Sequence, residues 1–224
     1  MKIIFSVCIA ALFFSCKSEP KNEKPVVTEE LTISEKIAKA HGYDAWKEVA
    51  QIDFTFNVDR DSSHFERSWS WKPVTNEVVM TTTTDTISYK RSKIDSLVVN
   101  ADKGFINDRY WLLAPFNLVW DTGIKETYSQ SALGPISGDS LQKLTIVYTS
   151  DGGYTPGDAY DFYFGDDYRI KEWVFRKKNV PEPSLITSWE DYQDFSGLHL
   201  ATVHNKNEGS WKLYFTNIKV TVKN

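Results

Sequence analysis

Ser140 has the neighbours that most resemble a catalytic motif, because Gly138-Asp139-Ser140-Leu141 has the spacing of a serine-hydrolase nucleophile. That chemistry needs a histidine that accepts the serine proton and an acid that orients the histidine. No Asp-x-x-His motif follows the serine, and the nearest arrangement is Asp194 with His199. We therefore interpret Ser140 as a turn residue and keep a hydrolase as the last of three functional hypotheses.

The histidines do not predict a metal site, and we expect no cofactor. None of His41, His64, His199 and His204 has a second histidine four residues away, the spacing that places two ligands on one helical face. His199 and His204 should point to opposite faces of a strand. His41 is expected at a helix C-terminus, where the helix dipole favours a partly cationic imidazole. The oxygen-rich loop of residues 151–158 lacks the spacing of a calcium loop, so cation binding there stays open.

Aromatic side chains carry the stronger functional signal. The chain has eight Trp, eleven Tyr and thirteen Phe, spread over the predicted strands. Burial of each stabilises the fold by about 1.5 to 3 kcal/mol, so most of them must pack in the core. A curled sheet with one helix does not always fill its concave face, and an unfilled apolar concavity is a ligand site by default. The candidates for a lid or cavity mouth are Tyr110, Trp111, Phe116 and Trp120, and those for the wall are Trp69, Trp71, Phe162, Phe164 and Trp173.

The first 16 residues resemble a bacterial lipoprotein signal. Lys2 precedes an apolar run over residues 3–14, and Ser15 stands directly before Cys16. A run of about 12 residues is too short to span a hydrocarbon core of roughly 30 Å. We expect cleavage before Cys16, whose thiol takes a diacylglycerol that ties the mature protein to a membrane.

Composition favours one domain behind a flexible tether. Residues 16–31 are rich in Lys, Glu and Pro and predict the tether, and residues 32–224 have the size of one domain. Cys8 leaves with the signal peptide of residues 1–15, so no thiol remains for a disulfide or a metal-thiolate site. The chain carries 26 basic and 30 acidic residues without a basic stripe, so nucleic-acid binding has no support.

Helical spacing is confined to the start and the centre of this domain. Thr32 and Glu35 have the spacing of a capping box before a helix that Gly42 ends, and residues 43–49 read as a further helical stretch. Residues 108–114 can form a short helix that Pro115 ends.

Alternating apolar and polar residues predict strands from residue 51 onward. About ten strands in meander order suggest one large sheet, and a sheet of that size tends to curl or close. The predicted fold class is mainly β (α+β): a single large curled antiparallel sheet, or unclosed β-barrel, with an N-terminal helix and a short helical lid. After the first strand, the runs cover residues 65–72, 77–82, 86–91, 96–100, 142–149, 159–164, 170–177, 184–194, 199–205 and 210–222.

Three stretches resemble a known family: residues 37–46 (IAKAHGYDAW), 104–116 (GFINDRYWLLAPF) and 188–198 (SWEDYQDFSGL). They are similar to the lipoprotein-sorting carriers of the LolA/LolB superfamily over most of residues 33–222. The resemblance implies an unclosed β-barrel whose concave apolar face is covered by helices and takes up acyl chains. Those carriers are soluble whereas this chain has its own anchor, so the resemblance concerns the fold and the ligand class and not the sorting activity.

The leading hypothesis is a non-enzymatic, lipid-anchored protein of the cell envelope that binds a lipid or other hydrophobic ligand in its aromatic concavity. The alternative is a structural or protein-interaction module with a filled core. We expect the membrane as a partner through the lipid on Cys16. Lys17 follows Cys16, and the lack of aspartate there favours the outer membrane. The membrane face, the protein partners and the oligomeric state stay open.

Overall fold

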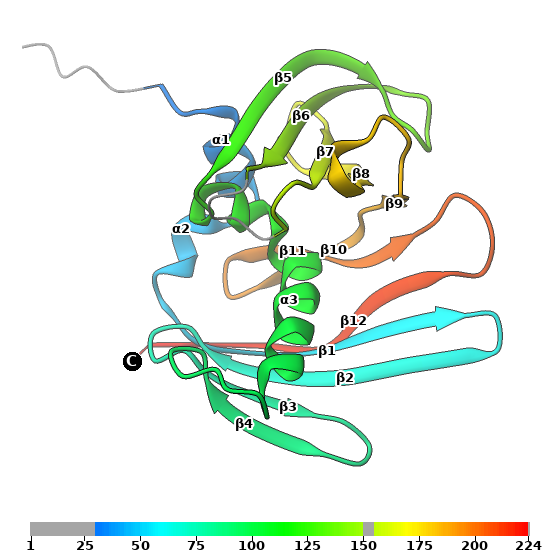
Figure 1. Cartoon of the computed structure of the whole chain (residues 1–224). Coiled ribbons are helices and arrows are strands. Elements are labelled where there is room, and N and C mark those ends of the chain that lie inside the picture. The colour runs from blue at the N-terminus through cyan, green and yellow to red at the C-terminus, as the bar shows by residue number, and fades with distance from the viewer. Residues whose placement is uncertain (1–29, 150–154, 224) are drawn as a thin grey trace, which may run out of the picture. The chain divides into compact units, whose positions relative to one another are not determined.

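Two antiparallel sheets and one long helix make up most of the chain from Leu31 onward, which forms one compact unit (Figure 1). The structure is a computed structural model and describes residues 30–149 and 155–223. The predictions for the signal peptide, for Cys16 and for most of the tether lie outside the described residues. No helix among the described residues is both long and apolar enough to cross a membrane.

The larger sheet has seven strands in the order β10-β11-β12-β1-β2-β3-β4, so the last strand of the chain pairs with the first. Apolar side chains of β1 alternate toward the core, where Ile52, Phe54 and Phe56 are buried. Its strands are β1 (Val49–Arg60), β2 (Ser63–Lys72), β3 (Glu77–Thr81), β4 (Thr86–Lys90), β10 (Glu190–Phe195), β11 (Leu198–Asn205) and β12 (Lys212–Val222).

The smaller sheet has five strands in sequence order, a meander from β5 to β9. Every residue of β7 is buried, because its two faces pack against different apolar clusters. The bounds are β5 (Ile124–Leu133), β6 (Ser140–Tyr148), β7 (Ala159–Phe164), β8 (Ile170–Arg176) and β9 (Leu185–Ser188), and a 3-10 turn, η1 (Lys177–Asn179), follows β8.

The two sheets meet at the corner between β9 and β10. The backbone N–H of Asn205 on β11 donates to Ser188 Oγ at 3.0 Å, so a side chain joins the strands there. The β5 and β4 edges are not hydrogen-bonded to each other, and neither sheet closes. The mainly β, unclosed fold is therefore confirmed, with its strands divided between two sheets.

The helical start follows the sequence pattern closely. Thr32 and Glu35 form the capping box of α1 (Ile33–Ala40), with Thr32 Oγ1 accepting from the Glu35 N–H at 3.2 Å. Gly42 follows in the left-handed conformation at φ +87°, and α2 (Tyr43–Trp46) begins after it. A Cβ at Gly42 would lie 1.9 Å from the carbonyl oxygen of Gly197, so only glycine fits this approach.

The central helix α3 (Val99–Trp120) is longer than the short helix expected over residues 108–114. Pro115 lies inside it, and the backbone of Leu113 leaves helical geometry there, so the proline bends the helix where it was expected to end it. The strand expected over residues 96–100 is wrong, since α3 begins at Val99. The strand β5 was not predicted, and residues 184–194 form two strands, β9 and β10.

Buried polar contacts hold α3 between the sheets. The Asp108 carboxylate has no exposed surface and accepts from Arg67 Nη2 at 2.7 Å and from Trp69 Nε1 at 2.8 Å, both on β2. Near the other end of α3, Asp121 accepts from the Tyr148 hydroxyl of β6 at 2.8 Å. The helix therefore contacts both sheets and fills much of the space that one curled sheet would have left open.

Candidate functional site

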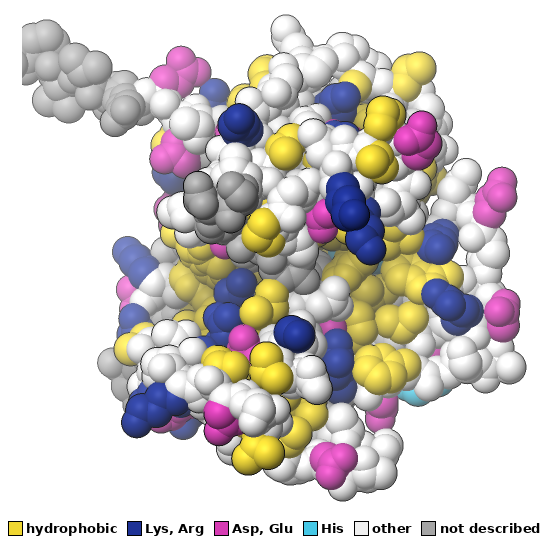
Figure 2. Space-filling view, in the orientation of Figure 1, with side chains coloured by type: hydrophobic (Ala, Val, Ile, Leu, Met, Phe, Trp, Pro, Cys, Tyr) yellow, Lys and Arg dark blue, Asp and Glu magenta, His cyan; other side chains and the backbone are white. Residues whose placement is uncertain are grey.

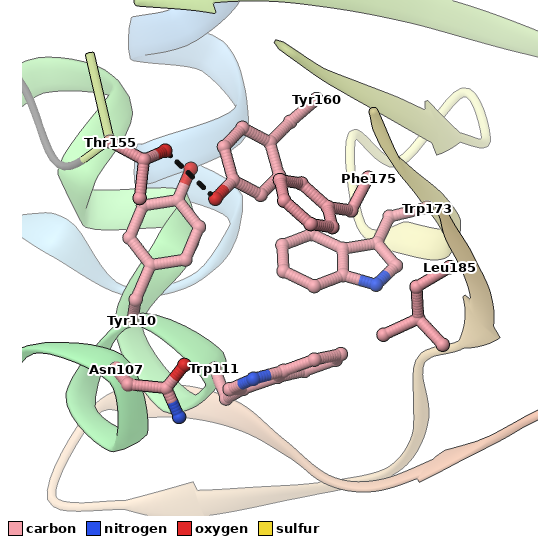
Figure 3. A pocket seen from close by; sticks show the side chains of 8 residues that line it. All are labelled: Asn107, Tyr110, Trp111, Thr155, Tyr160, Trp173, Phe175 and Leu185. Carbon is pink, nitrogen blue, oxygen red and sulfur yellow. Dashed lines mark hydrogen bonds between the residues drawn. The ribbon is translucent and has the colours of Figure 1, made fainter. Parts of the chain in front are cut away.

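An aromatic cavity of about 220 Å³ lies where α3 approaches the strands β7, β8 and β9. Five of its eight lining side chains are aromatic and none of the eight is charged, so it offers an apolar ligand a surface without a charge to desolvate. We call it the aromatic cavity; its lining residues are Asn107, Tyr110, Trp111, Thr155, Tyr160, Trp173, Phe175 and Leu185 (Figure 3).

Strand register builds one side of the aromatic cavity. Tyr160 on β7 pairs with Phe175 on β8, and their rings stack with centroids 5.1 Å apart. Trp173 precedes Phe175 by two residues and therefore shares its face of the strand. The ring centroids of Trp173 and Tyr160 are 5.3 Å apart. These three rings form a continuous apolar wall.

Helical periodicity builds the opposite side. Asn107, Tyr110 and Trp111 are spaced i, i+3 and i+4, which places them on one face of α3. The Trp111 ring lies 4.5 Å from Trp173 between centroids, so helix and sheet touch at this edge of the aromatic cavity. In Figure 3, Trp111 forms the floor and Tyr160 and Phe175 lie across from it.

The tyrosine hydroxyls of this region stay protonated. Burial is the main cause that raises the pKa of Tyr110, and burial also raises that of Tyr160. The Tyr160 hydroxyl lies 3.1 Å from Thr155 Oγ1, and those of Tyr110 and Tyr148 are 3.1 Å apart. The lining is therefore uncharged over the physiological pH range.

Three of the nine residues predicted for a ligand site, Tyr110, Trp111 and Trp173, line the aromatic cavity. The other six pack elsewhere in the core. Trp69 and Trp71 contact Phe105 with ring centroids 5.4 Å apart in each case. Phe116 and Trp120 pack against Trp46 of α2, and Phe162 and Phe164 are fully buried on β7.

Sequence reasoning missed Tyr160, Phe175, Leu185, Asn107 and Thr155. For Tyr160 and Phe175 the sequence did hold a signal, because aromatic residues recur at every second position of both strands. The strand register pairs these two residues. Leu185 lies in a four-residue strand that the sequence did not separate from β10. Figure 2 shows further hydrophobic side chains gathered in a hollow of this face, between the smaller sheet and the long strands β1, β2 and β12.

Ser140 begins β6, where it is exposed and its hydroxyl lies 2.9 Å from that of Ser131. Asp194 and His199 contact each other at 3.2 Å across the β10–β11 hairpin, as strand partners in register. The Ser140 hydroxyl therefore contacts another serine, and Asp194 and His199 contact each other, which gives the hydrolase hypothesis no support.

The histidines occupy separate surroundings. His41 caps the C-terminus of α1 as expected, but the expected partial charge is wrong, because burial lowers its pKa to about 4. His204 is buried and His199 is partly exposed, in agreement with opposite strand faces. No group of His, Cys, Asp and Glu in the described residues could hold a metal ion. Residues 151–154 of the possible cation loop lie outside the described residues.

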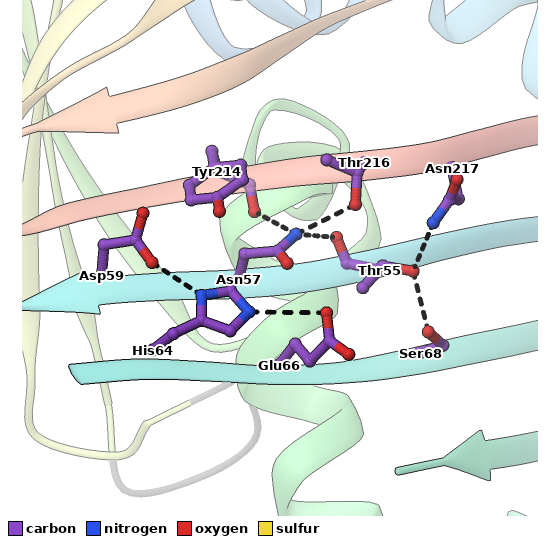
Figure 4. A network of polar contacts seen from close by, with 9 residues as sticks. All are labelled: Thr55, Asn57, Asp59, His64, Glu66, Ser68, Tyr214, Thr216 and Asn217. Atoms are coloured by element: carbon purple, nitrogen blue, oxygen red, sulfur yellow. Dashed lines mark hydrogen bonds and ion pairs between the residues drawn. The ribbon is translucent and has the colours of Figure 1, made fainter. Parts of the chain in front are cut away.

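His64 belongs to a polar network on the outer face of β1, β2 and β12 (Figure 4). Its Nδ1 lies 2.7 Å from Asp59 Oδ1 and its Nε2 lies 3.4 Å from Glu66 Oε2. The hydrogen bond with Asp59, followed by that with Glu66, raises the pKa of His64. The side chains of His64, Asp59 and Glu66 are 40 to 48% exposed, and none of them lines the aromatic cavity.

The chain is similar to several solved structures. A LolA superfamily protein from Nitrosomonas europaea has a TM-score of 0.50 at 9% identity, with 87% of this chain and 96% of that chain covered. For a DUF1329 family protein from Desulfovibrio piger the TM-score is 0.47 at 11% identity, with 85% of this chain and 92% of that chain covered. The lipoprotein LppX from Mycobacterium tuberculosis has a TM-score of 0.28 at 8% identity, with 84% of this chain and 97% of that chain covered.

No protein-family model matches the chain, and no curated protein matches it significantly. At 9% identity the likeness to the Nitrosomonas europaea structure concerns the fold alone. The chain therefore has a LolA-like fold, as the resemblance of its sequence predicted.

Proposed function

We propose that this chain is a lipid-anchored protein of the bacterial cell envelope that binds a lipid or other hydrophobic molecule in its aromatic cavity. The observation that carries the proposal is the composition of the lining: Tyr110, Trp111, Tyr160, Trp173 and Phe175 are aromatic, and none of the described lining side chains is charged. Such a cavity favours an apolar ligand, because binding removes the ligand's apolar surface from water. The resemblance of residues 37–46, 104–116 and 188–198 to the lipoprotein-sorting carriers, which implies uptake of acyl chains, supports the ligand class.

The volume sets the size of the ligand. About 220 Å³ is more than the roughly 150 Å³ cavity that holds benzene and less than the roughly 300 to 1,000 Å³ of a drug-sized pocket. The aromatic cavity therefore takes one short apolar chain or ring system. The remainder of a longer lipid would extend along the apolar hollow of the same face (Figure 2).

The anchor belongs to the proposal as well. Lys2, the apolar run and the Ser15-Cys16 junction support cleavage before Cys16 and acylation of its thiol. The membrane then holds the domain near a supply of lipid. Lys17 after Cys16 supports placement in the outer membrane.

The alternative, an interaction module with a filled core, also has an observation in its favour. Six of the nine aromatic residues first considered pack within the core, and large apolar side chains are exposed at Leu97 and Leu133. Exposed apolar residues of this kind can contact a protein partner. The two functions differ in whether a small molecule occupies the aromatic cavity.

Native mass spectrometry of the Cys16→Ser chain, purified without detergent, distinguishes ligand binding from the interaction module. The proposal predicts a bound apolar molecule in stoichiometric amount, identified after extraction into organic solvent, or uptake of added fatty acid or phospholipid. Leu185→Trp should fill the aromatic cavity and abolish binding, whereas Leu133→Trp makes the same change at a side chain that is 74% exposed and should not. A ligand-free mass that takes up neither probe would favour the interaction module.

A further inference from the structure

Four buried polar atoms beside the aromatic cavity have no hydrogen-bond partner within the described residues. They are Trp173 Nε1, Thr187 Oγ1, Trp189 Nε1 and His204 Nε2, and we call these four side chains the polar seat. Buried polar atoms in folded proteins are nearly always hydrogen-bonded, because an unpaired group keeps the full cost of its lost hydration. Four such atoms on adjoining side chains point to a polar partner from outside the described residues.

The four side chains adjoin one another. Trp173 on β8 lies directly opposite Thr187 on β9, so both side chains leave the sheet on the same face. The ring of Trp189 lies 5.6 Å from that of Trp173 and 4.6 Å from that of His204, measured between centroids. The polar seat is therefore one contiguous cluster.

The polar seat adjoins the aromatic cavity, and Trp173 belongs to both. Leu185, Thr187 and Trp189 alternate along the same face, and Leu185 lines the aromatic cavity. The Trp111 ring lies 4.5 Å from Trp173 and 5.3 Å from His204. Figure 3 shows the indole nitrogen of Trp173 on the side of its ring that faces Leu185 and Trp111.

The protonation state of His204 defines what the polar seat can bind. Its Nδ1 lies 3.2 Å from the carbonyl oxygen of Ser188, and a carbonyl only accepts, so Nδ1 carries the proton. Burial lowers the pKa of His204 to about 3, which keeps the ring neutral and leaves Nε2 as an acceptor. The indole N–H groups of Trp173 and Trp189 can only donate, and the Thr187 hydroxyl can do both.

We propose that the polar seat receives a hydroxyl group at the end of the hydrophobic ligand, so that the ligand is an uncharged apolar alcohol. The hydroxyl donates to His204 Nε2 and accepts from Trp173 Nε1 or Thr187 Oγ1. A carboxylate cannot donate, and an ammonium group cannot accept from the indoles. Either ion would also be buried without a counter-charge among these four side chains. This inference rests on the proposed function, because it assigns the ligand class of the same cavity.

Two probes with the same octyl chain test the assignment: 1-octanol, which can donate a hydrogen bond, and its methyl ether, which can only accept one. Both are titrated into the Cys16→Ser chain and followed by tryptophan fluorescence. We expect 1-octanol to bind about tenfold more tightly than the ether, which corresponds to one hydrogen bond of ordinary strength. His204→Phe removes the acceptor of the ligand's hydroxyl proton and should reduce this preference to about twofold or less. Thr187→Val removes a hydrogen bond that both probes can accept, so it should leave the preference intact.

The outcomes distinguish the two proposals. If both probes bind with equal affinity, the aromatic cavity binds apolar molecules, but the assignment of a hydroxyl group to the polar seat is wrong. A preference for 1-octanol that survives unchanged in His204→Phe would also overturn it. If neither probe binds, the proposed function fails together with the assignment of its ligand. If octanoate binds more tightly than 1-octanol at pH 8, the ligand is an acid and not an alcohol.

Discussion

His41 and His204 are imidazoles that the fold keeps neutral by burial. Burial is the main cause that lowers the pKa of His41 to about 4 and that of His204 to about 3, from 6.5. Below pH 6.5 the unfolded chain binds protons at both residues while the folded chain does not. Protons therefore favour unfolding. For each unit by which the pH falls below 6.5, each histidine lowers the free energy of unfolding by up to about 1.4 kcal/mol.

We therefore predict acid destabilisation well above the pH range in which carboxylates titrate. The free energy of unfolding should fall by about 2 kcal/mol for each of these histidines between pH 6.5 and 5. Urea unfolding at pH 7 and pH 5 measures the fall, and His204→Phe should have a clearly smaller fall than the parent chain. His64→Gln is the opposite control, because the raised pKa of His64 gives stability that is present at low pH and lost as the pH rises. An unchanged fall in His204→Phe would contradict the prediction.

A second prediction concerns the Thr187 hydroxyl and the stability of the ligand-free chain. Its hydroxyl is buried and has no hydrogen-bond partner in the described residues, and valine has nearly the same shape. Thr187→Val should therefore raise the free energy of unfolding by about 1 kcal/mol, even though it removes part of the polar seat. Thermal unfolding measures the change. A clear loss of stability would mean that the Thr187 hydroxyl already has a partner in the ligand-free protein.

At the scale of elements, α3 determines both the packing and the site. It presents Tyr110 and Trp111 to the aromatic cavity, while Asp108 on an adjacent face accepts from Arg67 and Trp69 of β2. The same helix therefore fixes one wall of the aromatic cavity through a buried ion pair. Loss of that pair should affect stability and ligand affinity together.

Asp108→Asn tests this arrangement. The change leaves the Arg67 guanidinium without its counter-charge, and Arg67 is mostly buried, with 21% of its side chain exposed. We expect the free energy of unfolding to fall by about 2 to 3 kcal/mol, and ligand affinity to fall with it. Glu77→Gln makes the same chemical change in ion pairs with Lys72 and Lys90 whose side chains are about half exposed, and should cost less than about 1 kcal/mol. Equal effects of the two substitutions would refute the anchoring role of Asp108.

The elements also show how far the sequence was informative. The capping box at Thr32, the stop at Gly42 and the alternation along β1 depend on local chemistry, and all three were predicted correctly. The full length of α3 was not, because a helix buried on most sides lacks an apolar stripe, and its buried Asp102 and Asp108 read as surface residues. The strand β5 is mostly exposed at a sheet edge and shows little alternation.

The site was only partly predictable for a related reason. Tyr110, Trp111 and Trp173 stood out as aromatic residues, but their convergence depends on the register of β7 with β8 and on the position of α3. The position of α3 against β7 and β8 relates segments about 50 residues or more apart, which no local pattern encodes. The division of the strands into two sheets also depends on such relations.

At the scale of the whole molecule, the proposed anchor and the domain have separate roles. The described residues from Leu31 onward form one compact unit, and Cys16 precedes it. Cys16→Ser should therefore release the protein from the membrane fraction without changing its circular dichroism spectrum or its melting temperature. Ser15→Thr, which leaves the cysteine in place, serves as the matched variant and should remain in the membrane fraction. Retention of Cys16→Ser in washed membranes would show that the chain is held there by another part.

The proposed function requires that the space between α3, β7, β8 and β9 holds an apolar ligand. Photo-crosslinking with a diazirine-bearing fatty alcohol, followed by mass spectrometry of the labelled peptides, tests it most directly. The proposal predicts labels on the peptides that contain Tyr110 and Trp111 or Trp173 and Phe175, reduced by excess unlabelled alcohol. Labels confined to exposed apolar residues such as Leu97 and Leu133, or labels that excess alcohol does not reduce, would contradict it.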